Sequence, residues 1–168
     1  MPESPENYEK VSIYPVDPDV RERLLATQIE CVFNWSTRDG WPMGVIMSCM
    51  WRDGRMWLTS GAQRHRIAAI RRDARCSVVV TSTGTDVGPG KTVTIKGRCV
   101  VHEDDETKAW FYPALAEKVV ATPGPAQDAF RKHLDSPLRV VLEVAPQKWL
   151  TCDAAKMMGE SFAQLGVG

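Results

Sequence analysis

Apolar residues along the chain fall mostly into short runs with the two-residue period of β-strands, and turn residues separate these runs. In the stretch 91–101, for example, Val93 and Ile95 alternate with polar neighbours. Asp-Gly pairs at positions 39–40 and 53–54 mark hairpin turns between neighbouring runs. The predicted strands are residues 29–36, 42–51, 55–60, 76–82 and 91–101, together with a pair of strands within residues 137–153.

Helical periodicity is confined to segments between and after these runs. A first helix is expected to start at Asp17-Pro18, and a short helix carries Ile67 and Ile70 three positions apart. Two longer helices are predicted over residues 102–119 and 123–136, and acidic residues in the first turn of the former suit the helix dipole.

Six or seven strands with a few peripheral helices predict a mainly β fold, a small antiparallel barrel. The 168 residues are expected to form one domain, 1–168. Within it, residues 1–16 are interpreted as an N-terminal arm because they hold three prolines and little periodicity. Residues 104–136 are interpreted as a helical insertion between strands.

Charge and cysteine content narrow the classes of function. Lysine plus arginine and aspartate plus glutamate both number 21, so no global field attracts nucleic acid or a membrane surface. The five cysteines include no Cys-x-x-Cys pair, which argues against a structural metal site and against a disulfide framework. No apolar run approaches ~18 residues, and the chain starts without a signal-peptide pattern. We therefore expect a cytoplasmic protein without membrane contact.

Positive charge is nevertheless concentrated just after the third predicted strand. Ser60 closes that strand, and Arg64, His65 and Arg66 stand at the start of the next helix. Free backbone N–H groups and the dipole at a helix N-terminus favour an anion, whereas cations there disfavour the helix itself. A bound phosphate would resolve this conflict. On the residues alone, solvated arginines are an equal alternative.

Three further arginines, Arg71, Arg72 and Arg75, follow in the same stretch. They are placed near the C-terminus of the predicted helix, where cations are favourable for the helix dipole. We therefore interpret these three as structural. A nucleic-acid module using residues 64–75 is disfavoured, because no aromatic residues are interleaved with the arginines and the net charge is zero.

The second predicted strand carries an apolar face. Met43, Val45, Met47 and Cys49 occupy alternate positions and so point to the same side. Two interpretations stay open from the residues: an apolar floor under a planar ring, or ordinary barrel core.

The order of these motifs resembles the split β-barrel family of pyridoxamine 5′-phosphate oxidase-like flavin and deazaflavin oxidoreductases. The resemblance covers mainly residues 20–102, with two Asp-Gly turns followed by "MWLTS", "RHR", "IRRDARCSVVV" and "VTIKGRCVV", and a weaker echo in "KWLTCDAAKM". It implies a six- or seven-stranded antiparallel split β-barrel and a homodimer. The cofactor would lie at the subunit interface, with its phosphate on the basic residues after the third strand.

The resemblance also implies individual cofactor contacts. Ser60 matches the hydroxyl residue that meets the phosphate, Arg66 stands in place of the usual lysine, and His65 in place of a frequent arginine. Residues 44–49 match the strand that flanks the flavin ring. The implied cofactor-binding residues are Val45, Ile46, Met47, Cys49, Thr59, Ser60, Arg64, His65, Arg66, Thr92, Trp149 and Lys156.

The function implied is hydride transfer between a bound FMN-type cofactor and a small organic substrate, with no catalytic acid or base assigned, because the cofactor carries the chemistry. FMN comes first, since one phosphate suffices for the basic cluster. A deazaflavin coenzyme is the alternative, and its anionic tail would need further cations such as Lys91, Arg98 or Lys156. A non-catalytic protein that stores or senses a flavin or deazaflavin is the second function considered.

Overall fold

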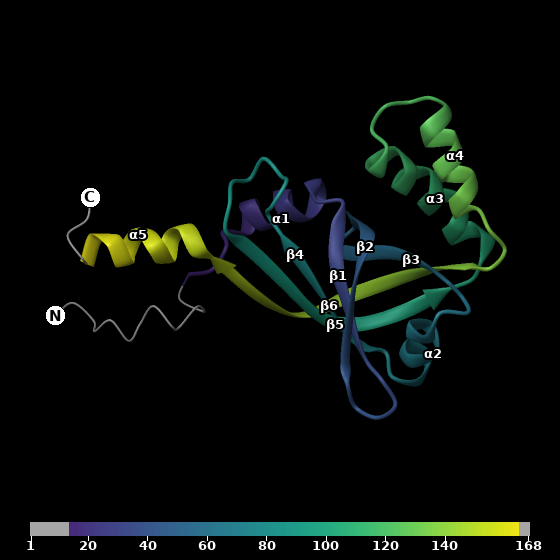
Figure 1. Ribbon diagram of the computed structural model, residues 1–168, viewed down its shortest axis with the longest axis horizontal. Coiled ribbons are helices and arrows are strands. Elements are labelled where there is room, and N and C mark those ends of the chain that lie inside the picture. The colour runs from purple at the N-terminus through teal and green to yellow at the C-terminus, as the bar shows by residue number, and fades with distance from the viewer. Residues whose placement is uncertain (1–13, 165–168) are drawn as a thin grey trace.

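Six antiparallel strands close into a barrel in the computed structural model, which describes residues 14–164, with side chains through Glu160 (Figure 1). The order of the strands around the barrel is β1-β2-β3-β6-β5-β4, and β1 pairs with β4 to complete the circle. The mainly β fold predicted from the sequence is confirmed. The strands are β1 (Glu30–Ser36), β2 (Pro42–Arg52), β3 (Arg55–Gly61), β4 (Arg75–Thr81), β5 (Lys91–His102) and β6 (Arg139–Asp153).

The prediction of two strands within residues 137–153 was wrong, because β6 is one continuous strand of 15 residues. Where the sequence suggested a turn, the register with β5 shifts instead: Lys96 pairs with Lys148, and Gly97 pairs with Pro146. Gln147 is the extra residue of a β-bulge. A proline lacks an N–H for the ladder and is tolerated at bulges, so Pro146 interrupts the pairing without ending the strand.

The bulge depends on Gly97, because a side chain there would overlap the backbone carbonyl oxygen of Ala145. We expect Gly97→Ala to lower the free energy of unfolding by about 1–3 kcal/mol, the usual cost of overpacking. Urea denaturation followed by circular dichroism measures the change. Gly159→Ala is the matched control, because a side chain at position 159 meets nothing within 4 Å. Equal stability of Gly97→Ala and the wild type would contradict the close approach.

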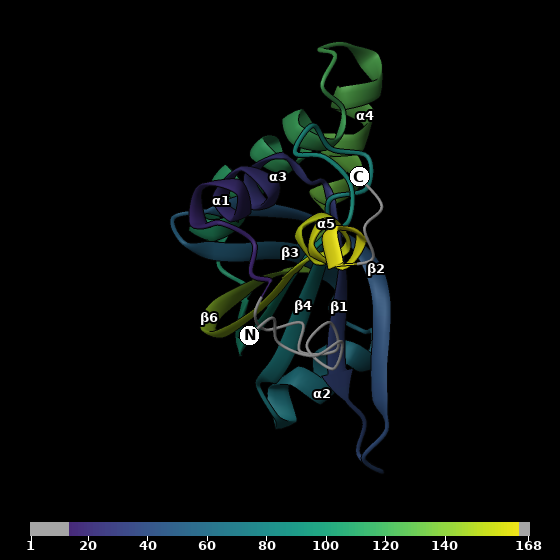
Figure 2. The ribbon, with the colours of Figure 1, turned by 90° about the vertical axis from the view of Figure 1, so that its left-hand side faces the viewer.

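Five helices surround the barrel among the described residues: α1 (Pro18–Thr27), α2 (His65–Arg72), α3 (Asp105–Val119), α4 (Pro125–Leu134) and α5 (Ala154–Gln164). α5 extends from one end, whereas α2, α3 and α4 gather toward the other, with α2 and α4 on opposite sides of it (Figures 1 and 2). The Asp104 side chain caps α3 by accepting a hydrogen bond from the Thr107 N–H at 2.7 Å. No helix of the described segment is long and apolar enough to span a membrane.

The predicted arm, residues 1–16, lies mostly outside the described residues. Residues 14–16 run along β6. The Asp153 N–H donates to the carbonyl of Tyr14 at 2.8 Å, and the Val16 N–H donates to Thr151 Oγ1 at 3.2 Å. Tyr14 and Val16 are both buried, so this part of the arm packs as an extension of the barrel wall.

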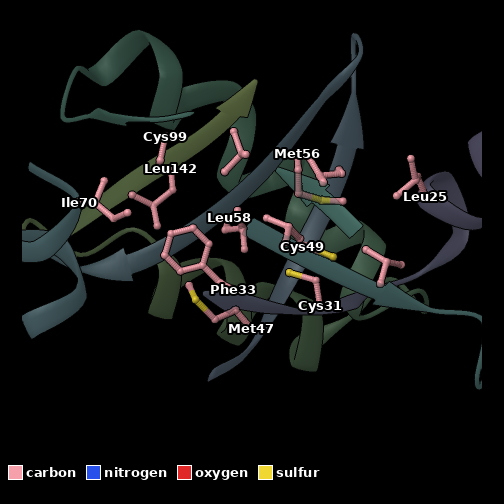
Figure 3. Close-up of a cluster of buried hydrophobic side chains, with 14 of the residues drawn as sticks. Leu25, Cys31, Phe33, Met47, Cys49, Met56, Leu58, Ile70, Cys99 and Leu142 are labelled. Atoms are coloured by element: carbon pink, nitrogen blue, oxygen red, sulfur yellow. The ribbon is translucent and has the colours of Figure 1, made fainter. Parts of the chain in front are cut away.

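Two apolar clusters hold the molecule together. The first fills the barrel and contains Phe33, Met47 and Leu58, with the free thiols of Cys31 and Cys49 side by side (Figure 3). The hydrogen bond between these two thiols, together with burial, raises the pKa of Cys31. The second cluster lies outside the barrel and fixes α3 and α4 to β2 and β6. Its buried members are Met50, Phe111, Tyr112, Leu115, Ala116, Leu134 and Val141.

Candidate functional site

The basic cluster predicted from the sequence lies where β3 ends and α2 begins. Ser60 is buried near the end of β3, and Arg66 Nη1 donates to Ser60 Oγ at 3.2 Å. Arg64 is the N-cap residue of α2 and provides no side-chain cap, and the first turn holds no acidic residue. The backbone N–H groups of that turn and two guanidinium groups therefore meet at one corner, which suits an anion.

The guanidinium of Arg66 lies in an environment that disfavours its positive charge. Partial burial and the neighbouring Arg64 both lower the pKa of Arg66. Its guanidinium lies over the ring of Trp35, with 5.7 Å between the guanidinium carbon and the ring centroid. No carboxylate within the described segment pairs with Arg64 or Arg66. A bound anion would relieve both the desolvation and the repulsion.

A cavity of about 360 Å³ opens beside this corner, and residues from the far end of the chain form its opposite wall. There, Arg139 Nη2 donates to His133 Nε2 at 3.1 Å. None of the residues that line the cavity is acidic, whereas three arginines and a histidine are present. Its lining is Met47, Ser48, Thr59, Ser60, Gly61, Gln63, Arg64, Arg66, Leu115, Phe130, His133, Leu134, Ser136, Leu138 and Arg139.

A second hollow, of about 440 Å³, lies on the other side of the same cations. Trp35, Met43 and Val45 give it an apolar wall, and Arg64, His65 and Arg66 border it. One cationic corner thus serves two neighbouring spaces: a polar cavity toward α4, and a hollow with an aromatic and aliphatic wall toward the β1–β2 hairpin.

Most of the predicted site residues come together here. Met47, Thr59, Ser60, Arg64 and Arg66 line the cavity, while Val45 and His65 border the second hollow. Cys49 is only 1% exposed inside the barrel, and Ile46 points outward with 71% exposure. The apolar face of β2 had two interpretations, a floor under a planar ring or ordinary barrel core. Cys49 belongs to the core, whereas Val45 and Met47 contribute both to the core and to the hollows.

Three predicted site residues, Thr92, Trp149 and Lys156, lie elsewhere. Ser60 pairs with Val140, and β5 reaches that level only at its last residues, about 30 Å along the strand from Thr92. Trp149 packs edge-on against Trp51 with ring centroids 5.8 Å apart. The ammonium of Lys156 contacts Asp17 Oδ1 at 2.8 Å. Within one chain, none of the three can share a ligand phosphate with Arg66.

Sequence reasoning missed the far wall of the cavity, including Phe130, His133 and Arg139. These residues carry no local motif, and they reach the site because β6 pairs with β3 and α4 follows α3 onto the second apolar cluster. Trp35 was also missed. Its only sequence signal was the inward alternation of β1, which ordinary core residues share.

The closed barrel and its basic corner place the chain among the split β-barrel proteins, as the order of motifs indicated. Residues 17–153 match the family model described as pyridoxamine 5′-phosphate oxidase, and the chain belongs to this family. No curated protein matches the sequence significantly. Low-identity matches among solved structures therefore provide the remaining comparisons.

Several solved structures share the fold. A conserved hypothetical protein of Mycobacterium tuberculosis is 16% identical with a TM-score of 0.72, and the match covers 86% of this chain and 88% of that one. An F420 Reductase is 18% identical with a TM-score of 0.60, covering 77% and 94%. A FAD-binding protein of Mesorhizobium loti is 18% identical with a TM-score of 0.59, covering 81% and 94%. At these identities the likeness concerns the fold.

Proposed function

We propose that this protein is an oxidoreductase that binds a phosphorylated flavin or deazaflavin and exchanges a hydride between it and a small organic substrate. The observation that carries the proposal is the corner formed by Ser60, Arg64 and Arg66, which has no counterion among the described residues and opens onto a hollow with an apolar wall. Membership of a family named for an oxidase and solved relatives named for flavin and F420 chemistry support it.

Each part of the corner has a role in holding such a cofactor. Ser60 Oγ and the N–H groups of the first turn of α2 donate to the phosphate, and Arg66 can offer two parallel N–H donors where a lysine offers a point charge. Trp35, Met43 and Val45 give the ring an apolar surface. The cofactor itself supplies the hydride chemistry when bound. His133 and Arg139 line the polar cavity on the other side of Arg64 and Arg66, and they suit a substrate with a negative charge.

The proposal includes a homodimer, because Thr92, Trp149 and Lys156 can join the site only from a second copy of the chain. The outer face of the barrel supports this. Its residues Ile46, Val32, Val79, Thr94 and Leu150 are directly opposite one another across five strands. Ile46 and Leu150 are 71% and 49% exposed, so the apolar side chains at the two ends of this row are open to a partner. The expected cytoplasmic location stays a prediction.

Titration of the purified protein with FMN and with a deazaflavin coenzyme tests the proposal. We expect one of them to bind and to remain bound through gel filtration, so that its visible absorbance elutes with the protein. Bleaching of that absorbance by a reductant, followed by recovery with a substrate, identifies an enzyme. Binding without turnover of any substrate would favour the storage or sensing alternative. A colourless protein that takes up neither cofactor would refute both.

A further inference from the structure

Two pairs of thiols lie in the barrel, and one of these pairs is open to solvent. All five cysteines are free. Cys31 and Cys49, here called the buried pair, are hydrogen-bonded to each other and are 3% and 1% exposed (Figure 3). Cys76 and Cys99, here called the open pair, are also hydrogen-bonded to each other. Cys99 is buried, whereas Cys76 is half-buried and borders a hollow of about 540 Å³.

The strand register brings the two thiols of the open pair together. The sequence had placed Arg75 at the end of a helix, but α2 ends at Arg72 and Arg75 begins β4. Cys76 is therefore directly opposite Gly97 on β5, and Cys99 lies two positions further along the same face of that strand. Because Gly97 has no side chain, the sulfur of Cys76 can reach across it to the sulfur of Cys99.

The buried pair has the same diagonal placement in different surroundings. Cys31 is directly opposite Met47 on β2, and Cys49 lies two positions beyond Met47. A long side chain thus stands where the open pair has a glycine, and both thiols belong to the barrel core. Susceptibility of a cysteine to oxidation follows its exposure. An oxidant in solution should therefore reach Cys76 before either thiol of the buried pair.

The two thiols of the open pair suit different roles. The hydrogen bond with Cys76, together with burial, raises the pKa of Cys99. Cys99 Sγ lies 3.6 Å from the carbonyl oxygen of Val100, and Cys76 Sγ lies 3.8 Å from the carbonyl oxygen of Gly97. A redox-sensing site has an accessible thiol that meets the oxidant and a neighbouring thiol that resolves the product. Cys76 fits the first role by exposure, and Cys99 fits the second by position.

We propose that Cys76 and Cys99 form a reversible disulfide when hydrogen peroxide is present. In the first step the sulfur of Cys76 attacks one peroxide oxygen. An S–O bond forms, the O–O bond breaks, and the departing hydroxide leaves with the thiol proton as water. In the second step the sulfur of Cys99 attacks the sulfenic acid at Cys76. The S–S bond forms, the S–O bond breaks, and the hydroxyl group leaves with the proton of Cys99 as a second water. The thiol pair loses two electrons, and the peroxide gains them.

The register also makes this disulfide easy to reduce. Diagonal neighbours on antiparallel strands are about 7–8 Å apart, whereas a disulfide usually joins Cα atoms about 4.4–6.8 Å apart. Formation of the bond must therefore pull β4 and β5 together at Cys76 and Cys99. Strained disulfides have higher reduction potentials and are typical of regulatory sites, whereas structural disulfides resist reduction. The open pair should accordingly return to thiols once the peroxide is removed and a thiol reductant is supplied.

Peroxide treatment of the full chain, followed by peptide mapping without a reductant, tests the proposal. Trypsin places the two cysteines on separate peptides, residues 76–91 and 99–108. We expect these two peptides to be joined by a disulfide and to separate again after treatment with dithiothreitol. This measurement uses the wild type, so it does not depend on the folding of any variant. A disulfide between other cysteines, or oxidation confined to Cys152, would overturn the proposal.

Two variants separate the roles of the thiols, and thermal unfolding shows that each is folded. In Cys99→Ala, Cys76 should remain a sulfenic acid, which mass spectrometry detects as its dimedone adduct. In Cys76→Ala, loss of the Cys99 thiol should be slower than in the wild type by at least about tenfold, because oxidation follows exposure. Cys31→Ala is the matched control, since it removes a thiol of the buried pair and should leave the rate of disulfide formation unchanged.

Three results with the folded variants would contradict the proposal. The first is the absence of a dimedone adduct at Cys76 in Cys99→Ala. The second is loss of the Cys99 thiol at the same rate in Cys76→Ala and in the wild type. The third is slowing of disulfide formation by Cys31→Ala as large as the slowing caused by Cys76→Ala, because the buried pair would then control the reaction.

Discussion

Replacing Arg66 with alanine is expected to raise the dissociation constant for the cofactor about 100-fold, because charge-assisted hydrogen bonds contribute about 1.5–3 kcal/mol. Arg66 is part-buried, contacts Ser60 Oγ and has no counterion within the described part of the chain, so its charge is available to a bound phosphate. Titration followed by fluorescence or calorimetry measures the change. Arg66→Lys should recover only part of the affinity, since a lysine cannot offer two parallel donors to one phosphate.

Arg72→Ala is the matched control for this experiment. Arg72 belongs to the same helix, but it is exposed and its Nη2 donates to the carbonyl of Ser36 at 2.8 Å. We expect its removal to change the affinity by less than about threefold, as for other surface positions. Equal losses for the two variants would contradict the assignment of the phosphate to the N-terminal end of α2.

Phe111→Ala is expected to lower the free energy of unfolding by about 3–5 kcal/mol, the usual cost of removing a buried phenyl ring. Phe111 is fully buried and belongs to the cluster that fixes α3 and α4 to β2 and β6. Chemical denaturation measures the loss. Limited proteolysis shows where it occurs, because loosened helices would be cut within residues 105–134 before the barrel unfolds.

Leu138→Ala provides the comparison for this second experiment. Leu138 lies just beyond α4 and is 62% exposed, so we expect a change within about 0.5 kcal/mol. If Phe111→Ala were no more destabilising than Leu138→Ala, the cluster would not be what holds the helices in place. Leu115 and Phe130 belong to or pack against the same cluster, and they also line the cavity. Phe111→Ala should therefore also lower the affinity for a ligand that fills this cavity.

The strands were predictable wherever a local pattern determines them. Alternation in residues 91–101 and the two Asp-Gly turns correspond to β5 and to the turns that precede β2 and β3. The division of residues 137–153 was wrong because Pro146 has the same signature in a turn and in a bulge. Only the pairing with Gly97, some 50 residues earlier, distinguishes the two. The tail after Asp153 showed no pattern that announced α5.

The residues of the candidate site also fall into those that a local pattern reveals and those that only long-range pairing brings together. Ser60, Arg64 and Arg66 were found because they are neighbours in the sequence and conflict locally with the start of a helix. His133 and Arg139 could not be found, because neither is unusual in its own segment. They face Arg66 only after β6 pairs with β3, which brings together residues more than 70 positions apart.

The position of Arg64 and Arg66 between the two hollows has a thermodynamic consequence. An anion in either space neutralises the same guanidinium groups, so each occupant reduces the electrostatic attraction for the other. Thermodynamic linkage is reciprocal. A bound cofactor phosphate should therefore raise the dissociation constant of an acidic substrate by the same factor by which that substrate raises the dissociation constant of the cofactor. While a phosphate occupies the corner, release of an acidic product from the polar cavity beside α4 would then be favoured.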